Sequence, residues 1–202
     1  MPLSASPGAA PSSAKVAFTL RELKESDLEP LTQTYYELYE ERDRGEPIGI
    51  HLFHQRPSHE DEVTWFAGLF RHVTSNESVV VIADVAGQPV GSCTVGPAGP
   101  LRASETGHVG VLGILVNRRF RGRGIGEALM RRTLELCRGQ FELVRLSVFA
   151  DNEGAKRLYS RLGFVACGRI PRAIKRGSRY IDEDLMILDL TAPNPSGRPT
   201  NR

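Results

Sequence analysis

The hydrophobic residues of this chain follow two different periods. Residues 16–20 alternate between apolar and polar, which is typical of a short strand, whereas Leu28, Leu31, Tyr35 and Leu38 recur at the spacing of one helix face. The same two periods predict helices at 60–72, 126–137 and 153–162, two strands within 78–96 around a turn at 86–88, and strands at 108–116, 143–149, 164–167 and 180–190. In the helix at 60–72, four apolar residues share one face: Val63, Phe66, Ala67 and Phe70.

The order of these elements indicates an α+β (mixed α/β) domain. They would build a mostly antiparallel sheet that contains one β–α–β crossover and has helices packed along it. We assign residues 16–190 to a single domain. Residues 1–15 and 191–202 are rich in Pro, Ser and Gly and show no apolar pattern, so we expect a disordered N-terminal arm and a disordered C-terminal tail.

Composition narrows the class of protein. No apolar run approaches the roughly 18 residues of a membrane span. The formal net charge is +2, but Lys15, Arg198 and Arg202 lie in the two tails, so the domain itself is close to neutral. A neutral domain lacks the general electrostatic footprint of a nucleic-acid-binding protein. We therefore expect neither a membrane nor a nucleic acid as partner.

Cysteine and histidine usage adds two expectations. Cys93, Cys137 and Cys167 are odd in number, widely spread and set in apolar patterns, so we expect reduced, buried thiols in a cytoplasmic protein. Three histidines share one loop without a cysteine or carboxylate constellation, and we predict no metal site there. They are His51, His54 and His59.

A glycine-rich loop between a predicted strand and a predicted helix is the most informative segment. Gly122, Gly124 and Gly126 permit backbone angles that bring several N–H groups to one point. Together with the positive end of the helix, these donors form an anion site suited to a pyrophosphate, and Arg121 and Arg123 add charge. The alternative is a glycine-rich turn with exposed arginines.

Two other phosphate-binding loops fit this segment poorly. A Walker loop needs Lys and then Ser or Thr after its last glycine, but Glu127 and Ala128 stand there. The dinucleotide fingerprint reads G-x-G-x-x-G, whereas this chain reads G-x-G-x-G. Glu142 lies near the spacing of a ribose-binding acid, but it precedes the next strand instead of ending it.

The segment RGRGIG meets the pattern [Q/R]-x-x-G-x-[G/A], which is the signature of the GNAT superfamily of N-acetyltransferases. The sequence thus resembles this superfamily, and among its members it is most similar to the bacterial amino-acid and ribosomal-protein-like acetyltransferases. The resemblance implies a twisted, mostly antiparallel sheet with flanking helices, splayed between the strands at 108–116 and 143–149. It implies acetyl-CoA as co-substrate, with main-chain groups near Leu115 and Val116 holding the pantetheine arm. The groups that would hold the pyrophosphate are Arg121, Gly122, Arg123, Gly124, Ile125, Gly126 and Glu127.

A second segment strengthens the resemblance. The family pattern N-x-x-A-x-x-x-Y-x-x-x-G-F is present as Asn152, Ala155, Tyr159, Gly163 and Phe164. By resemblance, Asn152 would hydrogen-bond the cofactor and Tyr159 would face the thioester sulfur. A phenol can protonate the departing thiolate while a neutral amine attacks the carbonyl directly, in a ternary complex. The alternative is a short amphipathic helix in which Tyr159 packs its ring.

The general base is harder to assign. Many relatives of this family carry Glu where Gly110 stands, and another group carries Glu where Ser147 stands. His108 lies on the same strand face as Gly110, and an imidazole exchanges protons near neutral pH, so we take it as the first candidate. A structural histidine, a water chain, or an acid at Glu37 or Glu40 stays open.

The acceptor is expected to be a primary amine. By resemblance, the two early helices line its site, which makes Tyr35, Tyr36, Tyr39, Glu37 and Glu40 plausible contacts. A small molecule such as an amino acid is preferred over a protein N-terminus or lysine, and a non-catalytic acyl-CoA sensor is the alternative of another class. A homodimer stays open. A basic segment could bind a substrate carboxylate or form surface ion pairs: Arg169, Arg172, Lys175, Arg176 and Arg179.

Overall fold

The computed structural model describes residues 16–99 and 104–192. The predicted arm at 1–15 and most of the predicted tail, 193–202, lie outside the described residues. The helices are α1 (Leu28–Asp43), α2 (His59–Thr74), α3 (Ile125–Cys137) and α4 (Glu153–Arg161), with short 3-10 turns at Glu25–Asp27 and Arg118–Phe120. The strands are β1 (Thr19–Glu22), β2 (Val79–Val85), β3 (Gln88–Pro97), β4 (Val109–Val116), β5 (Leu143–Phe149), β6 (Val165–Arg176) and β7 (Arg179–Asp189).

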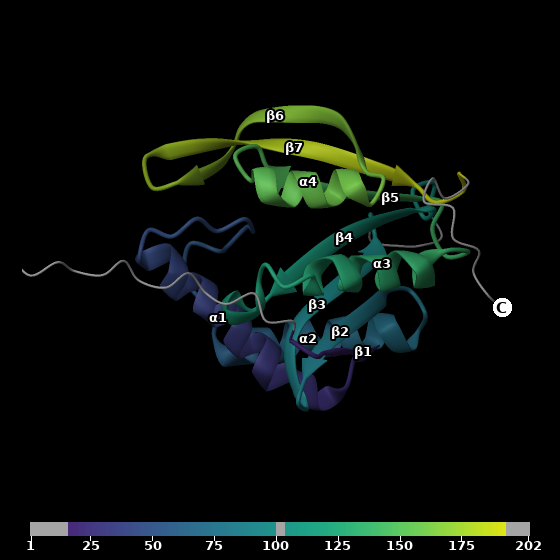
Figure 1. Ribbon diagram of the computed structural model, residues 1–202, viewed down its shortest axis with the longest axis horizontal. Coiled ribbons are helices and arrows are strands. Elements are labelled where there is room, and N and C mark those ends of the chain that lie inside the picture. Colours follow the sequence, from purple (N-terminus) through teal and green to yellow (C-terminus); the bar gives the residue numbers. More distant parts are fainter. Residues whose placement is uncertain (1–15, 100–103, 193–202) are drawn as a thin grey trace, which may run out of the picture.

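The strands of the described chain form one sheet in the order β1-β2-β3-β4-β5-β7-β6. All neighbours are antiparallel except β4 and β5, which are joined through α3 and run parallel. β4 pairs with β5 only from Val109 to Val111. Beyond that point the two strands separate, and Figure 1 shows β5, α4, β6 and β7 standing apart from the rest of the sheet. This confirms the predicted mixed α/β sheet and its splayed pair.

Local sequence explains where these elements begin and turn. Ser58 and Asp61 form a reciprocal capping box at the start of α2, with each side chain accepting the other's backbone N–H. The hairpin between β2 and β3 turns through Ala86 and Gly87, both at positive φ, and Asp84 accepts the N–H of Gly87 at 2.7 Å. These local bonds fix the entry of α2 and the register of the hairpin.

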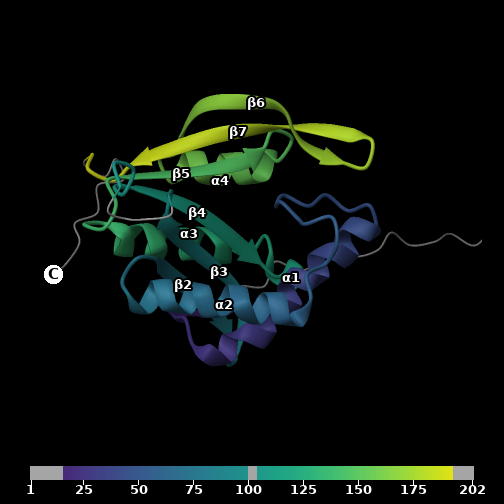
Figure 2. The same cartoon turned by 180° about the vertical axis from the view of Figure 1, so that it is seen from behind.

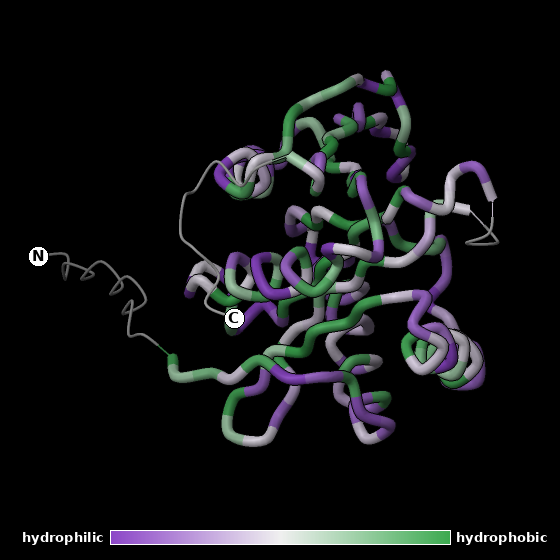
Figure 3. Tube along the Cα trace, turned by 90° about the vertical axis from the view of Figure 1, so that its right-hand side faces the viewer, coloured by the Kyte–Doolittle hydropathy of each residue, from purple (hydrophilic) through white to green (hydrophobic). Residues whose placement is uncertain are grey.

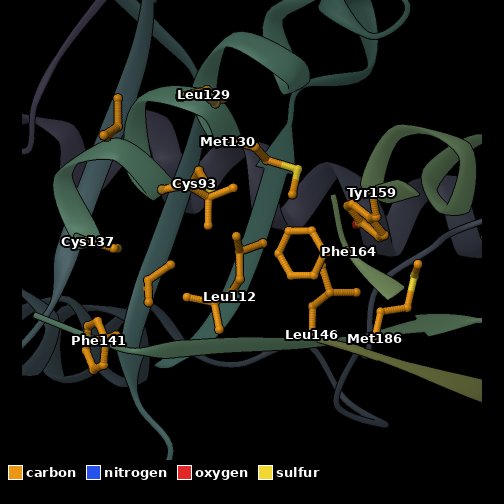
Figure 4. Packing of buried hydrophobic residues seen from close by; sticks show 14 of the residues in the cluster. Cys93, Leu112, Leu129, Met130, Cys137, Phe141, Leu146, Tyr159, Phe164 and Met186 are labelled. Carbon is orange, nitrogen blue, oxygen red and sulfur yellow. The ribbon is translucent and has the colours of Figure 1, made fainter. Parts of the chain in front are cut away.

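Helices cover both faces of the sheet. α3 packs against β2, β3 and β4 on one face, whereas α1 packs against β3 on the other and α2 lies against α1 (Figure 2). Hydrophobic residues run along the strands between these layers (Figure 3). The larger core cluster includes Met130, Cys93, Leu146 and Phe164 (Figure 4), and a smaller one, with Phe66 among its members, lies under α1 and α2.

Three expectations need correction. β6 continues to Arg176, well beyond the predicted 164–167. The prediction was too short because an exposed edge strand with register shifts shows no clean alternation of apolar and polar residues. On α2, Phe66 is buried as predicted, but Val63 is 39% exposed and Glu62 only 7%. Cys167 lies on this edge strand and is exposed, whereas the other two thiols are buried as expected. No helix of the described residues is long and apolar enough to cross a membrane.

Candidate functional site

The separation of β4 from β5 opens a groove of about 880 Å³. Its lining includes Leu115 and Val116 at the end of β4, together with Asn152 and Tyr159 from α4 and the turn before it. The loop at 45–50 closes another side. Four residues that the sequence assigned to cofactor binding and catalysis, which lie up to 44 positions apart, are thus brought to one groove.

The glycine loop presents free main-chain donors beside this groove. Gly122 and Gly124 have φ of 74° and 83°, and Gly124 is the N-cap of α3 in the left-handed conformation. The first helical bond runs from the N–H of Ala128 to the carbonyl of Gly124 at 3.1 Å. Within the described chain, no hydrogen bond is made by the N–H groups from 122 to 127, which form an anion site at the positive end of α3.

The arginine that opens the loop is engaged inside the protein. Arg121 donates to both carboxylate oxygens of Glu41 at 2.7 and 3.1 Å, and to the carbonyl of Val116 at 2.9 Å. Glu41 lies on α1 and is 2% exposed. Arg121 therefore connects α1 to the loop, and its guanidinium holds two protein partners at once.

The other two charged side chains of the loop, Arg123 and Glu127, are not held by α1 as Arg121 is. Arg123 lies 5.9 Å from the ring of Phe120 and has no ion-pair partner in the described part of the chain, so its charge is available to an anion. Glu127 pairs with Arg131 at 2.8 Å and Arg161 at 3.5 Å. The Arg131 hydrogen bond is the main reason that the pKa of Glu127 is held below its usual range.

Asn152 has a structural role in the groove. Its side-chain oxygen accepts the N–H of Ala155 at 3.1 Å and so caps α4. Its amide nitrogen faces Gly49, where an added Cβ would collide with it. The loop at 45–50 therefore passes directly over the start of α4, and Gly49 is the residue that permits this approach.

Tyr159 presents a phenol with no protein partner. The residue is 8% exposed, and its ring packs against Phe164 with centroids 6.1 Å apart (Figure 4). Its hydroxyl makes no hydrogen bond to any described residue. Burial, and to a smaller degree Cys93, raises the pKa of Tyr159 to about 12, so the phenol keeps its proton at neutral pH and can donate it to a group in the groove.

His108 is not brought into this constellation. It precedes β4 at the end where β4 still pairs with β5, and its carbonyl accepts the N–H groups of Glu142 and Leu143. Along an extended strand, seven residues separate it from Leu115 by roughly 23 Å. Its exposed side chain lines neither the groove nor the cavity described below.

The two positions where carboxylates were expected have different surroundings. Gly110 is buried, and an added Cβ would lie 2.5 Å from Val95 and 3.2 Å from Phe141, so the core leaves no room for a glutamate. Ser147 is exposed on β5. The fold thus explains the missing carboxylate at Gly110 by packing, and nothing in the structure explains Ser147.

A second cavity, of about 420 Å³, lies between α1, α2 and the strands β3 and β4. It shares Ile50, Ile114 and Leu115 with the groove, so the two spaces meet at the end of β4. Sequence reasoning missed its one buried carboxylate, Glu62. The signal was the spacing of that residue from Phe66 and Leu69, which puts it on the buried face of α2.

Only one of the early-helix candidates lines this second cavity, namely Tyr35. Tyr36 donates to the carbonyl of Pro57 at 3.0 Å, and Tyr39 is buried. Glu37 accepts from Asn117 at 2.9 Å. Glu40 lies on the outer side of α1, with Arg44 3.8 Å away.

The basic segment mostly forms contacts within the protein. Arg169 pairs with Asp184, Arg179 pairs with Asp151, and Arg172 stacks on Tyr180 at 4.1 Å. Arg176 donates to the carbonyls of Ile48 and Ile50, lies 5.3 Å from the ring of Phe149, and lines the groove. The hairpin of β6 and β7 thereby holds the loop at 45–50 in place.

Two of the three histidines that were considered for a metal site pair with carboxylates. His51 lies 2.8 Å from Glu183 and stacks on Phe149, and His59 lies 2.7 Å from Glu29. Across residues 16–99 and 104–192, no group of His, Cys, Asp and Glu is arranged to hold a metal ion.

Comparison with known proteins gives a family match and several curated relatives. The sequence model of the acetyltransferase (GNAT) family matches residues 20–164. The L-amino acid N-acetyltransferase AaaT of Escherichia coli (strain K12) is 33% identical over 104 residues, which cover 50% of this chain and 62% of that protein. The chain spans only about three fifths of the length of the curated relatives that it matches.

Solved structures share the fold. A ribosomal-protein-alanine N-acetyltransferase from Brucella melitensis superposes with a TM-score of 0.73 at 24% identity, over 85% of this chain and 99% of that chain. A GNAT superfamily phosphinothricin acetyltransferase from Sinorhizobium meliloti, in complex with AcCoA, gives 0.72 at 22% identity, over 91% and 93%. The splayed sheet expected from the sequence is thus the fold of these neighbours.

Proposed function

This chain belongs to the GNAT family of acetyltransferases, and we propose that it transfers the acetyl group of acetyl-CoA to a primary amine by direct attack in a ternary complex. The observation that carries the proposal is the unpartnered phenol of Tyr159, which lies in the same groove as the end of β4 and next to an anion site of free N–H groups.

The groove and the glycine loop beside it offer partners for the pyrophosphate and the pantetheine arm of acetyl-CoA. The pyrophosphate would accept hydrogen bonds from the N–H groups of 122–127, with Arg123 adding positive charge. Beyond Val111, β4 has no partner strand on the β5 side, so main-chain groups near Leu115 could bind the amides of the pantetheine arm, although the carbonyl of Val116 already accepts from Arg121. Asn152, at the start of α4, lines the same groove and would lie near this arm.

The chemistry then needs two groups from the protein. As the amine attacks the thioester carbon, negative charge grows on the carbonyl oxygen, which a free N–H of β4 would stabilise. The carbon–sulfur bond breaks, and Tyr159 supplies a proton to the departing sulfur. Burial raises the pKa of this phenol, so Tyr159 keeps its proton at neutral pH until the thiolate forms.

The preferred acceptor is the amine of a small molecule such as an amino acid. The support is the likeness to a curated L-amino acid N-acetyltransferase. Acetylation of a protein N-terminus or lysine is the second candidate. We also propose that the reaction takes place in the cytoplasm, because the three cysteines are free thiols.

The replacement Tyr159→Phe tests the proposed chemistry. We expect kcat to fall by about 100- to 10,000-fold, because the sulfur loses its proton donor, while the Kd for acetyl-CoA changes little. Thiol release measures turnover, and calorimetry measures binding. Tyr180→Phe is the matched control, since Tyr180 is 44% exposed on β7 and should tolerate the same change.

A panel of acceptors separates an enzyme from a binding module. Thiol release from acetyl-CoA is followed with amino acids, polyamines, aminoglycosides and N-terminal peptides. An enzyme releases thiol with at least one class and loses this activity in Tyr159→Phe. Binding of acetyl-CoA without turnover across the panel would instead identify a sensor of acyl-CoA.

A further inference from the structure

The cavity beside α2 holds a buried negative charge that no described residue neutralises. Glu62 is 7% exposed and lines the cavity, and its carboxylate has neither a hydrogen bond nor an ion pair within the described chain. Burying an unpaired carboxylate costs free energy, because the protein replaces the lost water with nothing of opposite charge. Such a group is suited to a cationic ligand.

The walls around this carboxylate are apolar, and two of them are aromatic side chains at the opening. Phe53 and Trp65 line the cavity but are 70% and 60% exposed. Large exposed aromatic rings around a hollow are typical of a binding site for an apolar group. The other apolar walls come from both early helices and from β2 and β4: Leu31, Phe66, Leu69, Val80 and Ile114.

The cavity also meets the groove that contains Tyr159. Ile50, Ile114 and Leu115 line both spaces, so an amine held in the cavity could reach a thioester held along β4. One end of the cavity is therefore placed for acyl transfer, and the rest of it is placed for recognition.

By resemblance the two early helices line the acceptor site, and this cavity lies between them and the sheet. We propose that its ligand is a primary amine with an apolar side chain, and that Glu62 binds the ammonium group and removes its proton. The inference rests on the proposed acetyl transfer and deepens it by naming the acceptor class and the base. It makes Glu62 of α2 the general base, a role for which the sequence had suggested His108.

The protons balance in this scheme. An ammonium R–NH₃⁺ gives one proton to the Glu62 carboxylate, and the neutral amine forms the new bond to the thioester carbon. As the carbon–sulfur bond breaks, the sulfur takes a proton from Tyr159, and the second proton of the nitrogen passes through solvent to the tyrosinate that this leaves. The products are the amide, the free thiol of CoA and one proton released to solvent, once Glu62 and Tyr159 regain their starting states.

The charges around Glu62 favour this role. Burial raises the pKa of Glu62, and the negative charge of Asp61 raises it further. The groups of α1 that face it are Tyr35 and Tyr36, whose pKa values are raised mainly by burial, so both stay neutral; Arg56 lies 4.6 Å from the Tyr36 ring. β3 and β4 contribute no charged side chain to the cavity. A carboxyl with a raised pKa is a better proton acceptor near neutral pH.

The replacement Glu62→Gln tests the base, with Glu60→Gln as matched control. Glu60 is exposed in the same first turn of α2, so its loss removes the same charge from the same helix end. With L-leucine as acceptor we expect kcat/KM to fall about 100-fold in Glu62→Gln and to stay unchanged in the control. Both variants should bind acetyl-CoA as the wild type does, which also shows that they fold.

The pH profile and the melting temperature add readouts that a purely structural role would not give. In the wild type, kcat/KM should fall as pH drops through the raised pKa of Glu62, and in Glu62→Gln only the ionisation of the amine should remain. Glu62→Asp should keep part of the activity, and its kcat/KM should still fall as pH drops. Glu62→Gln should melt at a higher temperature than the wild type, because a neutral amide costs less to bury than an unpaired carboxylate.

The acceptor class is tested by comparing L-leucine and L-phenylalanine with L-serine and L-glutamate. We expect kcat/KM to be at least about tenfold higher for the apolar pair. A preference for serine or glutamate would overturn the apolar site, and full activity with an unchanged pH profile in Glu62→Gln would overturn the base. Silence of the wild type with every amine would instead contradict the proposed acetyl transfer itself.

Discussion

The groove proposed for acetyl-CoA and the cavity proposed for the acceptor are built in different ways. The anion site beside the groove comes from consecutive residues, 122–127, whose main-chain N–H groups would do the binding. The acceptor cavity collects side chains from α1, α2, β3, β4 and the loop between the early helices. A contiguous main-chain site depends on where glycines occur, whereas an assembled side-chain site depends on which face each helix turns inward. The first can be located in a sequence far more easily than the second.

One ion pair connects these two regions. Arg121 comes from the glycine loop, and its partner Glu41 lies on α1, the helix that lines the acceptor cavity. The motif residue that was expected to add charge for a phosphate is held by α1 instead. Replacing either residue of this ion pair therefore tests how far the two regions depend on each other.

The replacement Arg121→Ala should have the largest effect on stability. It leaves the carboxylate of Glu41 buried without a partner, which costs about 3 kcal/mol in the free energy of unfolding. Urea denaturation measures the loss. Arg118→Ala removes a more exposed pair with Glu46 and should cost less than about 1 kcal/mol.

A double variant distinguishes a buried charge from a lost contact. Replacing both Arg121 and Glu41 by Met removes the charges together and should recover most of the stability. No recovery would mean that the bidentate geometry, and not the unpaired charge, determines the cost.

The replacement Gly124→Asp should separate cofactor binding from folding. Aspartate tolerates positive φ better than most residues, but its charge would lie next to the pyrophosphate. Two like charges about 4 Å apart near a protein surface repel by roughly 4 kcal/mol before screening. We expect the Kd for acetyl-CoA, measured by calorimetry, to rise about 100-fold.

Gly139 provides the matched control for this variant. It has the same φ of 83° and, like Gly124, no atom within 4 Å of an added Cβ, but it follows the far end of α3. Gly139→Asp should therefore carry the same backbone strain and leave acetyl-CoA binding unchanged. Equal weakening in both variants would show that strain, not the anion site, governs affinity.

The sequence predicted most of the fold because its strongest signals are local. β5 begins and ends at the predicted residues, and α3 and α4 differ from prediction by one residue at one end. β6 was predicted too short because an edge strand exposes both of its faces and is held by pairing with β7, a long-range effect that leaves no period in the sequence.

The candidate site shows the same difference between local signals and long-range packing. Leu115, Val116, Asn152 and Tyr159, which the sequence named as candidates, all line one groove, since each sits at a fixed distance from a strand end or helix start. Glu62 escaped notice because an acid in the first turn of a helix is usually a favourable dipole partner on the surface. Only the rotation of α2 against α1, set by the packing of Phe66, turns it inward.

The smallest predicted effect concerns Glu127, whose backbone belongs to the anion site while its carboxylate bonds Arg131 and Arg161. Its folded-state pKa is lowered, so its contribution to stability is present above the ordinary glutamate pKa of about 4.3 and is lost as pH falls through the lowered value. Glu127→Gln should therefore lower the free energy of unfolding at pH 7 by less than about 1 kcal/mol and make no difference near pH 2.

The same variant should bind acetyl-CoA slightly more tightly, about two- to threefold in Kd, because a negative charge beside the pyrophosphate is removed. Glu135→Gln at the other end of α3 breaks a comparable exposed pair with Arg132 and should leave the Kd unchanged. Tighter binding with lower stability would show that the Glu127 carboxylate weakens acetyl-CoA binding while it stabilises the fold. The Glu62 carboxylate is expected to do the reverse, since it lowers stability and serves the reaction. Weaker binding would instead place the Glu127 side chain among the ligands of acetyl-CoA and would make the anion site more than a main-chain feature.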